Sequence, residues 1–360
     1  MTNREADLVI RVAALKQSTG KRYIEVAAEL GLSEGEMIAA HQQLPSDMSA
    51  LSSQALLPRW SEIIQALESV GEVMALTRNP ACVHEKTGVY QLKSNESTHI
   101  GLVIGTEIDL RLFYKEWAYG FAVTDQSGKT EQISLQFFDH QGVAIHKVYL
   151  KPTSNREAFF TLVSRFQSAE KLVLPPKAAL QPVAKIDAPD DRIDINGFRT
   201  AWRSLRDTHE FFGLLKQFGV SRTQGLRLAE PEFAQAVDKS STHQILESAA
   251  SLGIEIMVFV VNHGVIQIHT GTVTKIAVMG PWLNVLDPGF NLHLREDLIA
   301  NSWVVRKPTV DGLVTSLEIY DEAGNVIAMF FGARKPGKPE RCEWRRLIDG
   351  LLEESTSCAA

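Results

Sequence analysis

The hydrophobic pattern changes from helical spacing to strand-like alternation, and it does so twice along the chain. In the first half, "KRYIEVAAELG", "SEGEMIAAHQQL" and "RWSEIIQALESVG" place apolar residues three or four positions apart, which predicts helices. Short apolar or alternating runs follow, separated by turn sequences such as "DQSG" and "DHQG", which predict strands joined by hairpins. The predicted strands are 72–78, 87–93, 99–105, 108–113, 119–124, 132–139 and 144–150, and a closing helix is predicted at 155–167.

The second half of the chain repeats the first. The segment "SLQFFDHQGVAIHKVY" (134–149) aligns without a gap with "SLEIYDEAGNVIAMFF" (316–331), at an offset of 182 residues. Further upstream, "LGLS" (30–33) recurs as "FGVS" (218–221) at an offset of 188 residues. Self-similarity over this length indicates two diverged copies of one unit.

Strands that follow one another through short turns form antiparallel sheets, with the helices segregated from them. We therefore predict an α+β fold of two tandem homologous repeats, each with N-terminal helices followed by a large antiparallel β-sheet. The proline-rich stretch "SAEKLVLPPKAALQPVAKIDAPDD" is unlike regular structure and predicts a linker. The predicted divisions are an N-terminal repeat at 1–170, a linker at 171–195 and a C-terminal repeat at 196–360.

Composition and charge limit the classes of partner. Hydrophobic residues make up 44% and charged residues 22% of the chain, and the net charge of −6 opposes broad docking on nucleic acid or on anionic membrane. The segment "KRYIEVAAELGLSEGEMIAAHQQ" resembles a helix-turn-helix. Its second helix, however, carries Glu34 and Glu36 and no lysine or arginine, which opposes phosphate contacts. No nucleic-acid partner is therefore expected.

The cysteines and the hydropathy indicate a compartment. Cys82, Cys342 and Cys358 form no CxxC pair, and so sparse a set fits a reducing cytoplasm better than a disulfide framework. The N-terminal residues show no signal-peptide pattern, and no run approaches about 18 apolar residues, so membrane insertion is not expected. These features predict a cytoplasmic protein.

One histidine lies in the helical pattern that opens the second repeat. Asp194 or Asn196 can cap a helix that starts near Gly197, and "RDTHEFFGLLKQFG" (206–219) continues the helical spacing to a terminal glycine. The apolar stripe of this predicted helix runs through Phe198, Trp202, Leu205, His209 and Phe212.

The stripe places His209 on the buried side of the helix or at its edge, where two interpretations are open. The ordinary one is a core histidine hydrogen-bonded to a carbonyl group. The other is an imidazole presented to a ligand. The equivalent residue of the first repeat is Lys21, so the scaffold does not require a histidine at this position.

Several longer stretches point to one family. They are "ALTRNPACVHEKTGVY", "EIDLRLF", "QFFDHQG", "DTHEFFGLLK", "QILESAASLGIEIMVFV" and "VVRKPTVDGLVTSLE". With these stretches, the chain resembles the hemin-degrading factor family, the HemS/ChuS type of cytoplasmic haem-utilisation protein, over nearly its whole length. The resemblance implies one non-covalently bound haem in a cleft associated with the C-terminal repeat.

The resemblance also implies roles for individual residues. The axial ligand of the haem iron falls on His209, and an arginine on the opposite face of the haem falls on Arg111, so these two are the expected catalytic residues. Met257 matches a family residue near the macrocycle. Phe331 stands where the family commonly has a tyrosine, which implies a lost hydrogen bond to a haem carboxylate. The groups on the haem carboxylates fall on Arg222, Lys307 and Arg334.

Two functions follow from the resemblance. The first is degradation of imported haem, with ring opening and iron release. It needs an external electron donor, because no GxGxxG motif follows a strand to indicate a flavin or nicotinamide domain. The alternative is an intracellular haem carrier that delivers haem to a separate haem oxygenase. The cytoplasmic side of a haem importer is a further expected partner.

Overall fold

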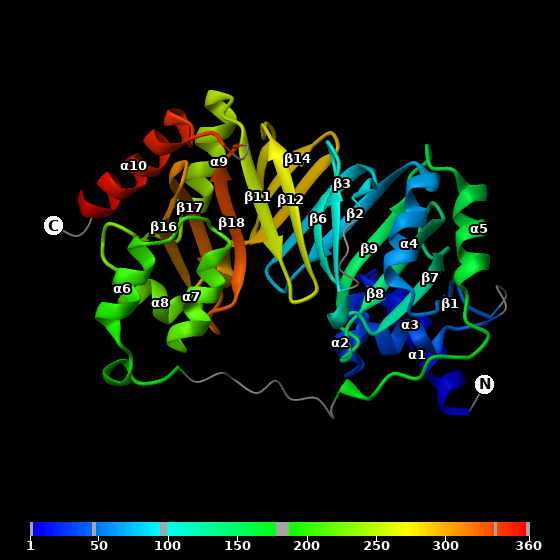
Figure 1. Ribbon diagram of the computed structural model, residues 1–360. Coiled ribbons are helices and arrows are strands. Elements are labelled where there is room, and N and C mark those ends of the chain that lie inside the picture. The colour runs from blue at the N-terminus through cyan, green and yellow to red at the C-terminus, as the bar shows by residue number, and fades with distance from the viewer. Residues whose placement is uncertain (1–2, 45–47, 94–98, 178–186, 335–336, 358–360) are drawn as a thin grey trace. The chain divides into compact units, whose positions relative to one another are not determined.

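The structure is a computed structural model and describes residues 3–44, 48–93, 99–177, 187–334 and 337–357 (Figure 1). The chain forms two compact units. Unit 1 comprises Met1–Arg78, Glu85–Pro182 and Asn262–Gln267, and unit 2 comprises Asn79–His84, Val183–Val261 and Ile268–Ala360. Part of the predicted linker, residues 178–186, lies outside the described residues.

Unit 1 begins with helices and continues with antiparallel strands. Its strands run in the order β1-β7-β8-β9-β2, and β4, β5 and β6 form a second antiparallel group. Its helices are α1 (Asn3–Thr19), α2 (Tyr23–Glu29), α3 (Glu34–Ala40), α4 (Trp60–Ala66) and α5 (Arg156–Phe166), with the 3-10 helices η1 (Leu67–Val70) and η2 (Tyr114–Glu116). Its strands are β1 (Leu51–Ala55), β2 (Glu72–Arg78), β4 (Leu92–Lys93), β5 (Ile100–Ile104), β6 (Asp109–Phe113), β7 (Tyr119–Asp125), β8 (Gln132–Phe138) and β9 (Ala144–Leu150).

Unit 2 repeats this order. Its strands run β10-β16-β17-β18-β11, and β13, β14 and β15 form the second antiparallel group. Its helices are α6 (Ile195–Arg203), α7 (Glu210–Phe218), α8 (Arg222–Leu228), α9 (Ser241–Leu252) and α10 (Cys342–Ser357), with η4 (Asp190–Arg192) and η5 (Glu296–Leu298). Its strands are β10 (Ala234–Val237), β11 (Ile256–Val261), β13 (Ile276–Met279), β14 (Trp282–Asp287), β15 (Phe290–Arg295), β16 (Asn301–Thr309), β17 (Gly312–Tyr320) and β18 (Val326–Gly332). Strands β3 (Cys82–Val89) and β12 (Val265–Gly271) have residues in both units.

The predicted α+β fold with two tandem repeats is confirmed, and some details differ. The strand predicted at 87–93 is instead the end of β3, which starts at Cys82, followed by the separate short strand β4, which starts at Leu92. The buried His84 of β3 interrupts the apolar pattern at the start of that strand. Strand β1 was not predicted. Its sequence "LSSQA" is polar, yet Ser53 is buried because its hydroxyl donates to the carbonyl of Ile38 at 2.7 Å.

Both faces of the main sheet in unit 1 are covered by helices. Strand β8 alternates across the sheet, so Leu135 and Phe137 face one side while Phe138 faces the other. Helices α4 and α5 pack with the first side, and α1, α2 and α3 pack with the second. This arrangement explains why β8 and β9 are buried along most of their length rather than on one face only.

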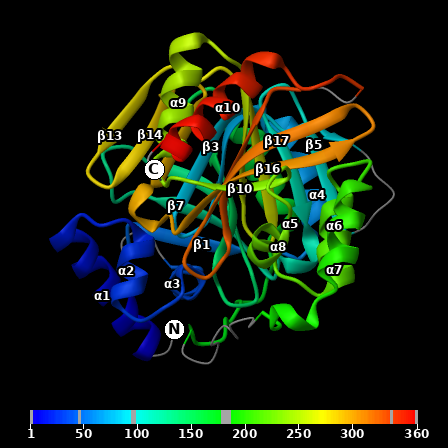
Figure 2. The ribbon, with the colours of Figure 1, turned by 90° about the vertical axis from the view of Figure 1, so that its left-hand side faces the viewer.

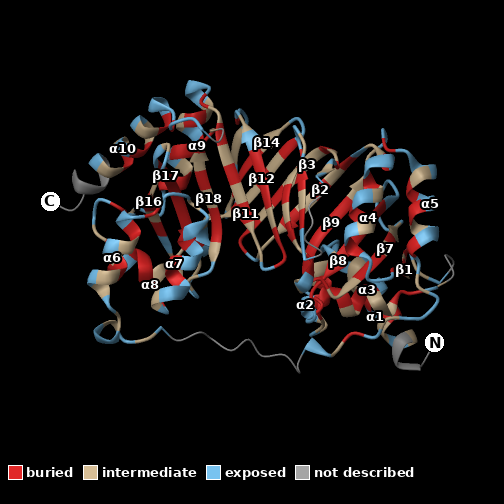
Figure 3. Cartoon of the chain, viewed as in Figure 1, coloured by how far each residue is buried: buried red, intermediate tan, exposed pale blue. Residues whose placement is uncertain are grey.

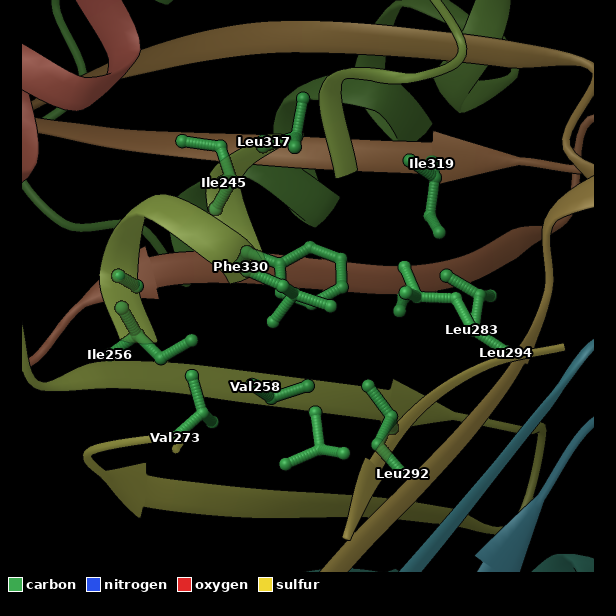
Figure 4. Close-up of a cluster of buried hydrophobic side chains, with 14 of the residues drawn as sticks. Ile245, Ile256, Val258, Val273, Leu283, Leu292, Leu294, Leu317, Ile319 and Phe330 are labelled. Atoms are coloured by element: carbon green, nitrogen blue, oxygen red, sulfur yellow. The ribbon is translucent and has the colours of Figure 1, made fainter. Parts of the chain in front are cut away.

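Unit 2 has the same three layers. Helices α9 and α10 lie side by side on one side of β16, β17 and β18, whereas α6, α7 and α8 lie on the other (Figures 1 and 2). Buried residues concentrate on these strands, while α6 and α7 mix buried and exposed positions (Figure 3). Figure 4 shows the apolar core beneath α9, where Phe330 of β18 lies among Ile245, Val258 and Leu317. In the described residues, no helix has the length and apolar character needed to cross a membrane.

The core of unit 2 provides a stability prediction. Phe330 is fully buried, so Phe330→Ala removes its apolar contacts and leaves a cavity that costs about 3–5 kcal/mol of unfolding free energy. Phe160→Ala is the control, because Phe160 is 47% exposed and its loss should cost less than about 1 kcal/mol. Urea denaturation followed by circular dichroism measures both, and equal losses would contradict this account of the core.

Candidate ligand site around His209

His209 lies in a loop between two helices rather than within one. Helix α6 ends at Arg203 and α7 begins at Glu210, so the prediction of one continuous helix is wrong. The cause is local, since side chains in this segment bond to the backbone and compete with helical hydrogen bonds. The Asp207 carboxylate accepts the backbone N–H of His209 at 2.8 Å, and the Glu210 carboxylate accepts that of Arg206 at 2.8 Å. The predicted cap is correct, because Asp194 caps α6 by accepting from the amide of Gly197.

The side chain of His209 is 92% exposed and precedes α7, so the prediction that it lies on the buried side of a helix or at its edge is wrong. Because α7 starts anew after the loop, Phe211, Leu214 and Leu215 form its buried face. Phe212, which was predicted to share the apolar stripe, is instead 75% exposed. Helix α7 ends as predicted at Gly219, whose φ of 65° is the left-handed conformation that glycine favours at a helix end.

Asp207 holds the imidazole of His209. Its Oδ1 lies 2.6 Å from Nδ1 of the ring. The backbone and side-chain hydrogen bonds from His209 lower the pKa of Asp207, which keeps the carboxylate ionised and able only to accept. In the neutral ring, Nδ1 therefore carries the hydrogen, and the lone pair lies on Nε2. No described residue bonds Nε2, so this nitrogen is available to a ligand.

Arg222 and Lys307 surround a carboxylate that has no exposed surface. Glu318 accepts from Lys307 Nζ at 2.7 Å and from Arg222 Nη2 at 2.7 Å, and the Tyr320 hydroxyl and Ser316 Oγ also donate to it. Burial raises the pKa of Glu318, but the two neighbouring cations outweigh it and hold that pKa well below its usual range. Burial lowers the pKa of Lys307 to about 8 against the opposite effect of Glu318. The cluster carries two cations and one anion, a surplus of one positive charge.

The Glu318 cluster also supports α7. The Arg222 guanidinium lies 5.1 Å and Lys307 Nζ lies 4.7 Å from the centre of the Phe211 ring, so both cations contact the first turn of that helix. The ring of Phe211 also packs against Trp202 of α6, with centroids 4.7 Å apart. The loop that carries His209 is therefore anchored at both ends by buried contacts.

The first repeat has the same kind of cluster, one buried carboxylate with two cations, but here the carboxylate is the residue at the start of the helix. Glu34, the repeat equivalent of Arg222, begins α3 just as Arg222 begins α8. Glu34 is buried and pairs with Lys147 Nζ at 2.6 Å and with Arg78. In the second repeat, the equivalent of Lys147 is Met329, whose sulfur lies 3.3 Å from Arg222. Glu34 therefore has a structural role and does not present its charge on an outward helix face.

The remaining predicted residues lie in three places. Arg334 follows β18 and is partly exposed, and its charge contributes to the lowered pKa of Asp207. Met257 and Phe331 are direct partners on the adjacent strands β11 and β18. Arg111 belongs to β6 of unit 1, where its partly exposed guanidinium pairs with Asp109.

The structure thus adds two residues that sequence analysis did not single out, Asp207 and Glu318. Asp207 had a local signal, because an aspartate two positions before a residue commonly accepts its backbone N–H. Glu318 had none, because a glutamate within a strand pattern is ordinarily assigned to the solvent side.

Comparison with known proteins identifies the family. The family model of the haemin-degrading HemS.ChuX domain matches residues 31–166 and 219–351, and the chain belongs to this family. It is 38% identical to the hemin transport protein HmuS of Yersinia pestis over 95% of this chain and 96% of HmuS. It is 39% identical to the hemin transport protein HemS of Yersinia enterocolitica, over 94% of this chain and 95% of HemS.

Solved structures show the same fold. The chain matches holo-PhuS, a heme-binding protein from Pseudomonas aeruginosa, with a TM-score of 0.90 and 42% identity, over 96% of this chain and 99% of that one. It also matches the heme degrading enzyme ChuS of Escherichia coli O157:H7, with a TM-score of 0.87 and 37% identity over the same shares.

The Glu318 cluster provides a second stability prediction. Glu318→Gln leaves Arg222 and Lys307 without their buried counter-charge and should lower the unfolding free energy by about 3–5 kcal/mol. Glu322→Gln is the matched control, because Glu322 is exposed on the β17–β18 turn and loses the same charge. Thermal and urea unfolding measure both variants. A loss below 1 kcal/mol for Glu318→Gln would show that the cluster does not stabilise unit 2.

Proposed function

We propose that the chain binds one haem non-covalently, with Nε2 of His209 as the iron ligand. The observation that carries this proposal is the geometry of His209: an exposed ring whose Nδ1 is held by Asp207 and whose Nε2 bonds no described residue. A neutral imidazole whose second nitrogen donates its N–H to a carboxylate is a common metal ligand. Membership of the haemin-degrading family and the likeness to holo-PhuS support haem as the ligand.

The surroundings of His209 fit a flat apolar disc with two carboxylates. Phe212 is exposed in the first turn of α7, which directly follows His209, and offers an apolar surface. Arg222 and Arg334 are partly exposed and can donate to carboxylates, while the buried Lys307 contributes to the surplus positive charge of the Glu318 cluster. We propose these three residues for the haem carboxylates.

Met257, Phe331 and Arg111 remain predictions. Met257 is proposed near the macrocycle, and Phe331 is proposed to leave one haem carboxylate without the hydrogen bond that a tyrosine would give. Arg111 is proposed as a catalytic residue, because a guanidinium can stabilise negative charge that develops during reaction. It belongs to a different unit from His209, so its role needs its own test.

Haem degradation is the proposed activity, and carriage is the alternative. One similar protein is called a heme degrading enzyme and another a hemin transport protein, so the names support either role. Degradation requires an external electron donor. Carriage requires a separate haem oxygenase as the acceptor, and in either role the cytoplasmic side of an importer is the proposed source of haem. A cytoplasmic location is part of this proposal.

Removal of the ligand tests haem binding directly. His209→Ala should shift the Soret band of the hemin complex and weaken hemin affinity by about 100-fold or more, above the 10–100-fold loss typical of residues that only support a metal ligand. His243→Ala is the control, because His243 lies on α9 of the same unit and pairs with Glu247 and Glu296. Titration with hemin followed by absorbance measures both. An unchanged spectrum and affinity in His209→Ala would refute the assignment.

A second experiment separates degradation from carriage. The hemin complex is mixed with ascorbate in the presence of catalase, which removes free peroxide, and the Soret band is followed. Degradation predicts loss of the band and release of iron, with the rate in Arg111→Ala about 100-fold lower and its hemin spectrum retained. An intact Soret band, together with faster haem transfer to a haem oxygenase than to apomyoglobin, would support carriage instead.

A further inference from the structure

The loop from Arg206 to Glu210 places two carboxylates close to one exposed imidazole. Oδ1 of Asp207 receives both the backbone N–H and the ring Nδ1–H of His209, at 2.8 and 2.6 Å. The carboxylate of Glu210 instead accepts from the backbone amides of Arg206 and Asp207, at 2.8 and 3.3 Å. Of these two carboxylates, Asp207 therefore bonds the imidazole, while Glu210 bonds the backbone of the loop.

We infer that Asp207 is a positioning residue that fixes the tautomer of His209 and, through its negative charge, strengthens Nε2 as a donor to haem iron. This inference rests on the proposed function. It goes beyond that function because it assigns control of the iron's electronic state to a side chain that does not touch the haem.

Two features of the geometry carry the inference. Because one oxygen atom accepts both hydrogens, turning the ring away from Asp207 breaks the Nδ1–H bond, and this bond therefore favours one direction of Nε2 relative to the loop. The loop is also fixed to the rest of unit 2, because the backbone N–H of Val310 donates to the carbonyl of Arg206 at 3.0 Å. The ligand is thus oriented before haem arrives.

Charge provides the second step. A carboxylate that accepts the Nδ1 hydrogen gives the ring partial imidazolate character and raises its basicity as a ligand. A more basic axial ligand stabilises ferric over ferrous iron and so lowers the reduction potential. Asp207 and His209 side chains are 60% and 92% exposed without a ligand. A disc lying over this loop would exclude water, and the interaction between the two side chains would then strengthen.

Arg334 also carries a positive charge that acts on Asp207. Three charged groups therefore act near the His209 imidazole. The Asp207 carboxylate bonds its Nδ1, the Glu210 carboxylate bonds the backbone of the same loop, and the Arg334 guanidinium acts on Asp207. Of these three, only the Asp207 charge is coupled to the ring through a hydrogen bond.

The test compares Asp207→Asn with Asp207→Ala. Asparagine keeps an oxygen that can accept both hydrogens but removes the charge, whereas alanine removes both. We expect Asp207→Asn to raise the ferric/ferrous midpoint potential of the hemin complex and to lower the iron–histidine stretching frequency in resonance Raman spectra. Haem dissociation into apomyoglobin should become about 10–100-fold faster. Glu210→Gln is the control, since it loses the same charge from the same loop without touching the ring.

Three results would separate the possibilities. A shift in Asp207→Asn with none in Glu210→Gln supports the inference. Wild-type potential and stretching frequency in Asp207→Asn, or equal shifts in Asp207→Asn and Glu210→Gln, would overturn it and leave Asp207 a loop-shaping residue or a general contributor of charge. His209→Ala, measured beside them, distinguishes failure of the inference from failure of the proposed function, because only the latter leaves its hemin spectrum unchanged.

Discussion

The fully buried carboxylate of Glu318 is the constraint on which the candidate site depends. A carboxylate out of contact with water requires positive partners and hydrogen-bond donors. Arg222 from the start of α8 and Lys307 from β16 meet that requirement, and their other sides contact the ring of Phe211. One buried charge thereby ties two strands to the first turns of α7 and α8. The position of His209, two residues before Phe211, follows from that attachment.

In both repeats, a charged residue at the start of a helix is paired with buried charges on the sheet, but the sign of that residue differs. A helix begins over the sheet in both, and its first residue is charged and partly or fully buried. Glu34 is neutralised by Lys147 and Arg78 in the first repeat, whereas Arg222 is neutralised by Glu318 in the second. The exchange shows that the fold needs a paired charge at this position but does not specify its sign. The charge at this position can therefore be one that suits a ligand. The second repeat combines a positive charge there, Arg222, with the exposed His209.

The helix-to-loop change at residues 204–209 separates what the pattern could predict from what it could not. Apolar spacing describes which residues face a core if a helix continues, and it correctly identified Phe198, Trp202 and the glycine that ends α7. It could not detect that Asp207 and Glu210 would bond to the backbone and interrupt the helix. That interruption moves His209 from a predicted buried face to an exposed position. The choice of His209 as the candidate ligand came from the family resemblance and from the lysine at the equivalent position of the first repeat.

The sequence by itself determined the repeated unit, the α+β class, most of the strands, and the cap at Asp194 and the terminal Gly219 of the helical region around His209, because hydrophobic periodicity and turn residues are local signals. It also marked Arg222 and Lys307 as charged positions of interest. Only the tertiary structure decided that these cations share the buried Glu318 and that Asp207 holds Nδ1 while Nε2 stays exposed. The reason is physical. The Glu318 cluster depends on residues up to 98 positions apart, and tautomer and exposure depend on three-dimensional neighbours that a linear pattern does not contain.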